Sequence, residues 1–143
     1  MDDFDPRADY PLGTRRPDLV RTPSGLPLVE LTLEALRGGR LFAGDMRATD
    51  ETLLRQAAVA GARGRTQLAE NLARAAELTT VPDDVILEIY TALRPHRSTA
   101  AELEAWAERL ATDYGAPRVA AFVREAKAAY VERGLLATAE APR

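Results

Sequence analysis

Apolar side chains recur at helical spacing along most of the chain after residue 30, and the clearest case lies in the middle of the sequence. Its apolar stripe consists of Ile86, Ile89, Tyr90 and Leu93, at positions i, i+3, i+4 and i+7. Thr80 is a suitable N-cap because its hydroxyl can accept an unpaired amide hydrogen of the first turn. Pro82 fits the first helical positions, and Asp83 with Asp84 place negative charge at the positive end of the helix dipole. The stretch is therefore predicted to be one helix that ends before Pro95.

Further helices are predicted from the same spacing and from capping residues. They cover approximately residues 31–37, 49–62, 64–78, 99–114 and 117–134. In the second of these, the expected buried side consists of Leu53, Leu54, Ala57 and Ala58. Thr99 and Glu102 have the spacing of a capping box, and Gly134 is the expected C-terminal stop of the last helix. Because no convincing alternating strand pattern occurs, the fold class is predicted to be mainly α, with a helical domain of about five to six helices over residues 31–136.

Residues 1–30 have a different pattern, rich in proline and without a helical period. Five of the nine prolines lie here, at Pro6, Pro11, Pro17, Pro23 and Pro27. Proline disfavours a helix at its own position and at the residue before it, so an extended N-terminal arm is predicted. The arm is too apolar for a solvated linker and should lie in a groove, either on its own domain or on a partner. We favour a partner, since thirty structureless residues inside a compact domain would be unusual. The tail, residues 137–143, has no pattern and is expected to fray.

Composition excludes several classes of function. The chain has 143 residues and a net charge of −3, which gives no basic footprint for nucleic acid. Since there is no cysteine, disulfides and thiolate chemistry are impossible. No apolar run approaches the roughly 20 residues of a membrane span, and the acidic N-terminus does not resemble a signal peptide. The protein is expected to be cytoplasmic, with neither nucleic acid nor membrane among its partners.

The residues themselves suggest no catalytic chemistry. His96 is the only histidine, and no nucleophile–base arrangement can be assembled around it from spacing alone. Asp84 and Glu88 share a helix face, but such a pair is common on solvated helices and no third ligand supports a metal site. The glycines at Gly61 and Gly64 lack the strand and the lysine of a phosphate-binding loop. We therefore expect no catalytic, cofactor-binding or metal-binding residue in this chain.

Contact with a partner protein is the remaining possibility. Charged residues at turns and helix ends either form a solvated face or pair with carboxylates and guanidinium groups of a partner. The candidate interface residues are Tyr10, Leu12, Asp45, Arg47, Arg74, Asp83, Asp84, Arg94, Arg97 and Arg124. Trp106 and Tyr130, at core-like positions, are expected to serve packing rather than binding.

Several sequence blocks resemble a known family. They are D-Y-P-L at Asp9–Leu12, L-T-L-E at Leu31–Glu34, D-M-R at Asp45–Arg47, the long stretch from Ala75 to Thr99, A-A-F-V-R-E-A at Ala120–Ala126 and Y-V-E-R at Tyr130–Arg133. In this order and spacing, over about nine tenths of the chain, they resemble the small (gamma) subunit of the adenosylcobalamin-dependent diol and glycerol dehydratases. The related pattern usually has tyrosine where this chain has His96, so the family does not need an imidazole there.

The resemblance implies a function that the residues alone do not. In such dehydratases large (alpha), medium (beta) and small subunits form a dimer of heterotrimers, and cobalamin lies between the large and medium subunits. The large subunit holds the catalytic residues, and a radical reaction converts propanediol or glycerol to an aldehyde. The small subunit is largely helical and packs on the large one. The resemblance thus implies a non-catalytic structural subunit of a hydro-lyase, with adenosylcobalamin in the assembled holoenzyme and not bound by this chain alone.

Three points remain open at this stage. Only eight residues precede Asp9, whereas members packaged into bacterial microcompartments often carry a longer extension, so packaging through this subunit is not expected. One alternative function is a stand-alone helical adaptor or regulatory module. Another is an accessory to cobalamin exchange in a reactivating complex.

Overall fold

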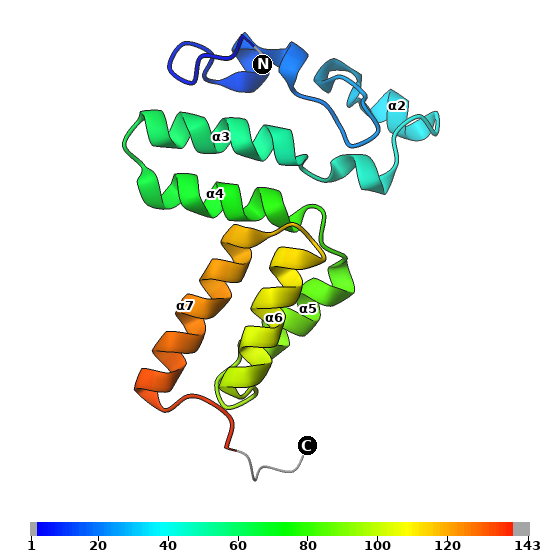
Figure 1. Cartoon of the computed structure of the whole chain (residues 1–143). Coiled ribbons are helices and arrows are strands. Elements are labelled where there is room, and N and C mark those ends of the chain that lie inside the picture. Colours follow the sequence, from blue (N-terminus) through cyan, green and yellow to red (C-terminus); the bar gives the residue numbers. More distant parts are fainter. Residues whose placement is uncertain (1–2, 139–143) are drawn as a thin grey trace. The chain divides into compact units, whose positions relative to one another are not determined.

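The computed structural model describes residues 3–138, and its regular structure is helical apart from one isolated β-bridge between Arg21 and Pro27 (Figure 1). In chain order the helices of this range are α1 (Leu12–Arg15), η1 (Pro17–Leu19), η2 (Leu28–Glu30), α2 (Leu33–Arg37), η3 (Ala43–Met46), α3 (Asp50–Ala62), α4 (Thr66–Leu78), α5 (Asp83–Ala92), α6 (Ala100–Thr112) and α7 (Pro117–Arg133). The prediction of a mainly α chain is confirmed. The chain divides into two compact units, unit 1 over Met1–Thr79 and unit 2 over Thr80–Arg143.

Unit 1 is built on a hairpin of α3 and α4, which lie side by side (Figure 1). Val59 and Ala60 of α3 are buried, as are Ala73 and Ala76 of α4. Since most of these side chains are small, the two helix backbones can approach closely. The buried side of α3 differs from the predicted one, because Leu54 is 50% exposed and Val59 is 6% exposed.

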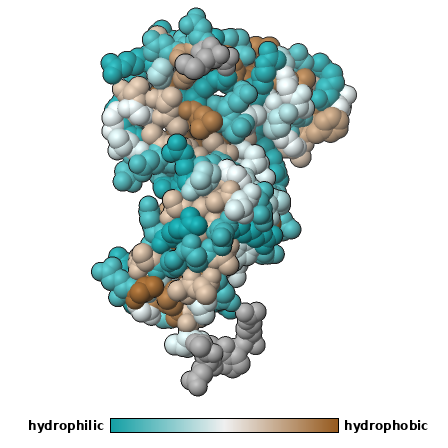
Figure 2. Space-filling model, viewed as in Figure 1, coloured by the Kyte–Doolittle hydropathy of each residue, from teal (hydrophilic) through white to brown (hydrophobic). Residues whose placement is uncertain are grey.

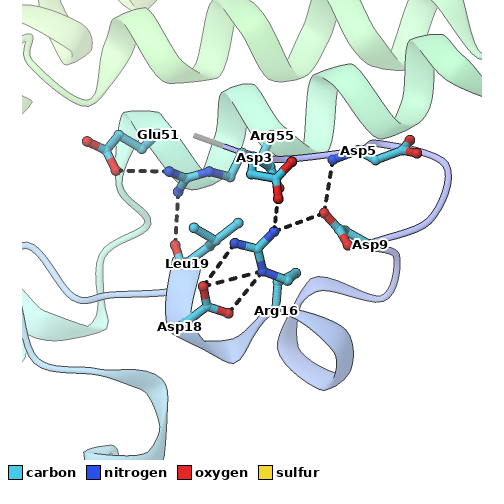
Figure 3. Close-up of polar contacts among 8 residues, drawn as sticks. All are labelled: Asp3, Asp5, Asp9, Arg16, Asp18, Leu19, Glu51 and Arg55. Carbon is cyan, nitrogen blue, oxygen red and sulfur yellow. Dashed lines mark hydrogen bonds and ion pairs between the residues drawn. The ribbon is translucent and has the colours of Figure 1, made fainter. Parts of the chain in front are cut away.

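Residues 3–30 carry short helical turns where the sequence predicted an extended arm. Arg16 organises them: its guanidinium pairs with Asp9 at 3.2 Å and with Asp18 at 3.0 Å (Figure 3). From α3, the Nη1 atom of Arg55 donates a hydrogen bond of 2.9 Å to the carbonyl oxygen of Leu19. The described part of this segment therefore contacts its own unit. Its binding to a partner stays a prediction.

Unit 2 contains α5, α6 and α7, of which α6 and α7 pack against each other (Figure 1). The largest fully buried side chains of the described chain are Leu103 and Leu110 from α6 and Val123 from α7. The hydroxyl of Tyr130 donates a 2.5 Å hydrogen bond to the carbonyl oxygen of Leu93, which agrees with a packing role for this tyrosine.

The ends of unit 2 are also tied together. The amide of His96 donates a hydrogen bond of 2.7 Å to the carbonyl oxygen of Leu135. The amide of Ala137 donates a hydrogen bond of 2.9 Å to the carbonyl oxygen of Ser98. These bonds join the loop after α5 to the chain after α7. The tail predicted to fray, residues 137–143, lies outside the described residues from 139 onward.

Most predicted helix ends are confirmed. Thr32 and Thr49 cap α2 and α3 by accepting an amide hydrogen three residues ahead. Gly134 ends α7 in the left-handed conformation, at a φ of 65°. The exception is α5, which begins at Asp83 with Pro82 at the N-cap position, so Pro82 precedes the helix instead of opening it.

The capping box of α6 provides a test of these local interactions. Thr99 accepts from the amide of Glu102 at 3.3 Å, and the Glu102 carboxylate accepts from the amide of Thr99 at 2.9 Å. Replacing Thr99 by alanine is expected to lower the free energy of unfolding by about 1 kcal/mol, measured by urea denaturation. Thr112→Ala, at the other end of α6 and exposed, should change it by less than about 0.5 kcal/mol. Equal losses in the two variants would argue against a special role of the cap.

Candidate subunit interface

The ten predicted interface residues are divided equally between the two units. Unit 1 contains Tyr10, Leu12, Asp45, Arg47 and Arg74, and unit 2 contains Asp83, Asp84, Arg94, Arg97 and Arg124. Most are exposed, but Leu12 and Asp45 are only 8% and 5% exposed. These two side chains therefore have roles inside unit 1.

Asp45 holds together two parts of unit 1. Its Oδ2 atom accepts a hydrogen bond of 2.9 Å from the amide of Phe42, at the start of η3. Hydrogen bonding by the Ser24 hydroxyl, with further bonds from Phe42 and Thr22, lowers the pKa of the Asp45 carboxyl. The carboxylate thus connects the loop at residues 22–24 to η3, a role that sequence reasoning missed because Thr22 and Ser24 lie about twenty residues away in the sequence.

Arg124 is engaged within unit 2. Its Nε atom lies 2.7 Å from Oε1 of Glu104, and Lys127 pairs with the other oxygen of the same carboxylate. The bonds from Lys127 and Arg124 lower the pKa of Glu104. Because these side chains are partly solvated, the network aligns α6 with α7 more than it stabilises them.

The loop after α5 presents Arg94 and Arg97 to solvent on either side of His96. His96 has a φ of 60°, in the left-handed region that non-glycine residues seldom adopt. Neither arginine side chain forms an ion pair within residues 3–138, so both remain open to carboxylates of a partner. At the start of α5, the Asp84 carboxylate accepts from the amide of Val85 at 2.9 Å.

Large apolar side chains are exposed in both units, and Figure 2 shows such residues at the surface. Sequence reasoning did not single out the densest set, residues 29–46 of unit 1. Its members are Val29, Leu33, Leu36, Phe42 and Met46, which are 51–72% exposed. The short helices α2 and η3 cannot bury these side chains themselves. In unit 2, Leu87 and Tyr90 of α5 are 65% and 71% exposed. Tyr90 was predicted in the apolar stripe of this helix, so part of that stripe faces outward. Exposed apolar surface of this kind is typical of protein–protein interfaces.

A cavity of about 440 Å³ lies in unit 1, at the end of the α3–α4 hairpin. Tyr10 and Leu12, two of the predicted interface residues, form part of its lining. The lining also includes Arg63 and Arg65, which sequence reasoning did not select. The structure thus brings two predicted residues together with two cations more than fifty positions away in the sequence.

Other kinds of site find no support in the described part of the chain. Residues 3–138 contain no group of three or more histidine, cysteine, aspartate or glutamate side chains placed to hold a metal ion. Over the same range, every helix is too short or too polar to cross a membrane.

Comparison with known proteins identifies relatives over nearly the whole chain. A family model described as the dehydratase small subunit matches residues 6–137. The propanediol dehydratase small subunit of Citrobacter freundii is 54% identical over 125 residues, which are 87% of this chain and 73% of the relative. The protein of the same name from Salmonella typhimurium strain LT2 is 53% identical over 126 residues, or 88% of this chain and 73% of the relative.

Proposed function

This chain belongs to the dehydratase small subunit family, and we propose that it is the non-catalytic small subunit of an adenosylcobalamin-dependent propanediol or glycerol dehydratase. The observation that carries the proposal is its 54% identity, over 125 residues, to a propanediol dehydratase small subunit. The enzyme is a hydro-lyase, which removes water from a 1,2-diol and releases an aldehyde.

The chemistry belongs to other parts of the proposed assembly. Adenosylcobalamin supplies the radical when bound, and a protein around such a cofactor contributes binding, orientation and the exclusion of side reactions. In the proposed assembly the cofactor lies between the large and medium subunits, away from this chain. The single histidine, His96, lies on an exposed turn, and no step of the reaction is assigned to it.

The part assigned to this chain is to bind and support the large subunit, in a dimer of heterotrimers that also contains the medium subunit. Two features support it: the apolar side chains exposed at residues 29–46, and Arg94 with Arg97, whose side chains have no ion pair within the described residues. A partner would remove the apolar groups from water and provide carboxylates for the guanidinium groups. We propose that the exposed members of the predicted interface set contact the large subunit.

Co-purification tests this proposal. The tagged chain is co-expressed with the large and medium subunits, and cobalamin-dependent aldehyde formation is assayed from 1,2-propanediol and from glycerol. We expect a stable complex whose activity falls by at least about tenfold when this chain is omitted. If the chain elutes alone while the other subunits assemble and turn over without it, the proposal is wrong and the stand-alone adaptor becomes the better interpretation.

A further inference from the structure

The cavity of unit 1 has two arginines, Arg63 and Arg65, in its lining. At the end of α3, Gly64 adopts a φ of 73°, and its amide donates to the carbonyl oxygen of Gly61 at 2.9 Å. The amide of Arg65 donates to the carbonyl oxygen of Ala60, also at 2.9 Å. These two bonds form a Schellman motif, a well-defined helix ending. The motif fixes the backbone of Arg63 and Arg65 on either side of the glycine, so both side chains begin at defined positions beside the cavity.

Another part of the lining comes from the start of the chain. The guanidinium carbon of Arg63 lies 4.8 Å from the ring centroid of Tyr10, in cation–π geometry. A guanidinium that stacks with its face on a ring keeps its N–H groups available at the edge for a carboxylate. Leu12 and Leu72 add apolar surface to the same lining. The cavity therefore combines an apolar wall with donors suited to an anion.

The charge of the cavity lining indicates which chemical group can bind there. The cavity lining contains two arginines and neither aspartate nor glutamate, although the whole chain carries a net charge of −3. Neither Arg63 nor Arg65 forms a side-chain ion pair within the described residues. The volume, about 440 Å³, lies within the roughly 300–1,000 Å³ of ordinary ligand pockets. The complementary group is thus a carboxylate next to an apolar side chain.

We infer that this cavity is a docking site for an acidic, apolar peptide segment of a partner dehydratase subunit. The inference rests on the proposed function, which supplies a permanent protein partner. A peptide fits better than a small enclosed ligand because Tyr10 and Leu68, both in the lining, are 48% and 43% exposed. A chain laid across them would cover these groups, as partners cover apolar patches at interfaces.

Competition for assembly tests the inference. Wild-type chain and the double variant Arg63→Glu, Arg65→Glu are co-expressed in equal amounts with limiting large and medium subunits. Mass spectrometry gives the ratio of the two chains in the purified complex, normalised to their ratio in the soluble lysate. Placing negative charge against the partner's carboxylate should lower incorporation about 100-fold, and the disadvantage should shrink in high salt. The double variant Arg7→Glu, Arg133→Glu makes the same charge change outside the cavity and should lower incorporation less than about threefold.

The outcomes separate the inference from the proposed function. If the wild-type chain does not enter a complex, the proposed function fails. If the wild-type chain assembles and the cavity variant assembles equally well, the inference alone is overturned. The same holds if both double variants are impaired equally, because a general effect of charge would then explain the loss.

The occupant is identified by crosslinking in the active complex, which does not depend on a charge variant that folds. Leu68→p-benzoylphenylalanine places a photoreactive group in the cavity lining, and the same change at Gln67, outside the lining, gives the background. We expect the Leu68 position to crosslink to a partner-subunit peptide with aspartate or glutamate next to an apolar residue. A crosslink to a second copy of this chain, or no crosslink above background, would overturn the inference.

Discussion

Replacing Leu110 by alanine is expected to lower the free energy of unfolding of the chain by about 2–5 kcal/mol. Leu110 is completely buried in α6, which packs against α7. The change removes apolar area from the core and leaves a cavity that the neighbouring side chains fill only in part. Because small domains are stable by only about 5–15 kcal/mol, this is a large fraction of the total. Urea denaturation followed by circular dichroism would measure it.

Leu87 provides the matched control for this experiment. It is also a leucine of a unit 2 helix, but it is 65% exposed in α5. Leu87→Ala should change the free energy of unfolding by less than about 0.5 kcal/mol, since little area leaves the core. If both variants lost stability equally, Leu110 would not be at the centre of this core. A loss of assembly with Leu87→Ala, at unchanged stability, would instead place α5 at an interface.

Local interactions explain why most helix boundaries could be predicted from the sequence. The caps at Thr49 and Thr99 bond to amides only three residues away, and Gly134 adopts a conformation that its lack of a side chain permits. Such features need no knowledge of the tertiary fold. The six helices predicted after residue 30 therefore correspond to α2–α7. The family resemblance, read from blocks of sequence, is confirmed by the family model.

The buried faces of the helices were harder to predict. In α5, apolar residues cover much of the helix circumference. Ile89 can therefore belong to a stripe with Ile86 and Tyr90 or to one with Val85, four residues before it. The predicted stripe includes Tyr90, which is 71% exposed, whereas Val85, outside that stripe, is 7% exposed. Which stripe is buried depends on what packs against the helix, and periodicity alone does not contain that information. The exposed stripe is then available to a partner, which a single-chain argument cannot include.

The same limit applies to the candidate site. Tyr10 and Leu12 belong to the apolar N-terminal arm that was predicted to lie on a partner, but Arg63 and Arg65 had no distinguishing signal. Their significance comes from the contact between the start of the chain and the end of α3, which is a tertiary feature. Asp45 shows a second tertiary feature of this kind. Its predicted interface role stays a prediction, and hydrogen bonds from Ser24 and Thr22 connect its carboxylate to a distant part of unit 1.

Asp45→Asn is expected to lower the melting temperature of the chain by roughly 5–10 °C near neutral pH. The carboxylate is 5% exposed and accepts hydrogen bonds from Ser24, Phe42 and Thr22. Asparagine has nearly the same shape, but its neutral oxygen accepts more weakly and its amide group adds donors where donors already point. Thermal unfolding by circular dichroism measures the effect. Asp113→Asn, at a side chain 59% exposed, is the control and should shift the melting temperature by less than about 2 °C.

The pH dependence of this difference tests the charge itself. The pKa of Asp45 is lower in the folded chain than its ordinary value of about 3.9, so the folded state binds the proton less readily than the unfolded state. The resulting stabilisation is fully present above the unfolded pKa and is lost as pH falls through the folded pKa. The difference in melting temperature between wild type and Asp45→Asn should therefore be constant from pH 7 to about pH 5 and decrease below about pH 4. Other carboxylates, such as Glu104, titrate in both proteins, and their contributions cancel in the comparison. A difference that stays constant down to about pH 3 would mean that the added amide donors of asparagine, and not the lost negative charge, cause the destabilisation.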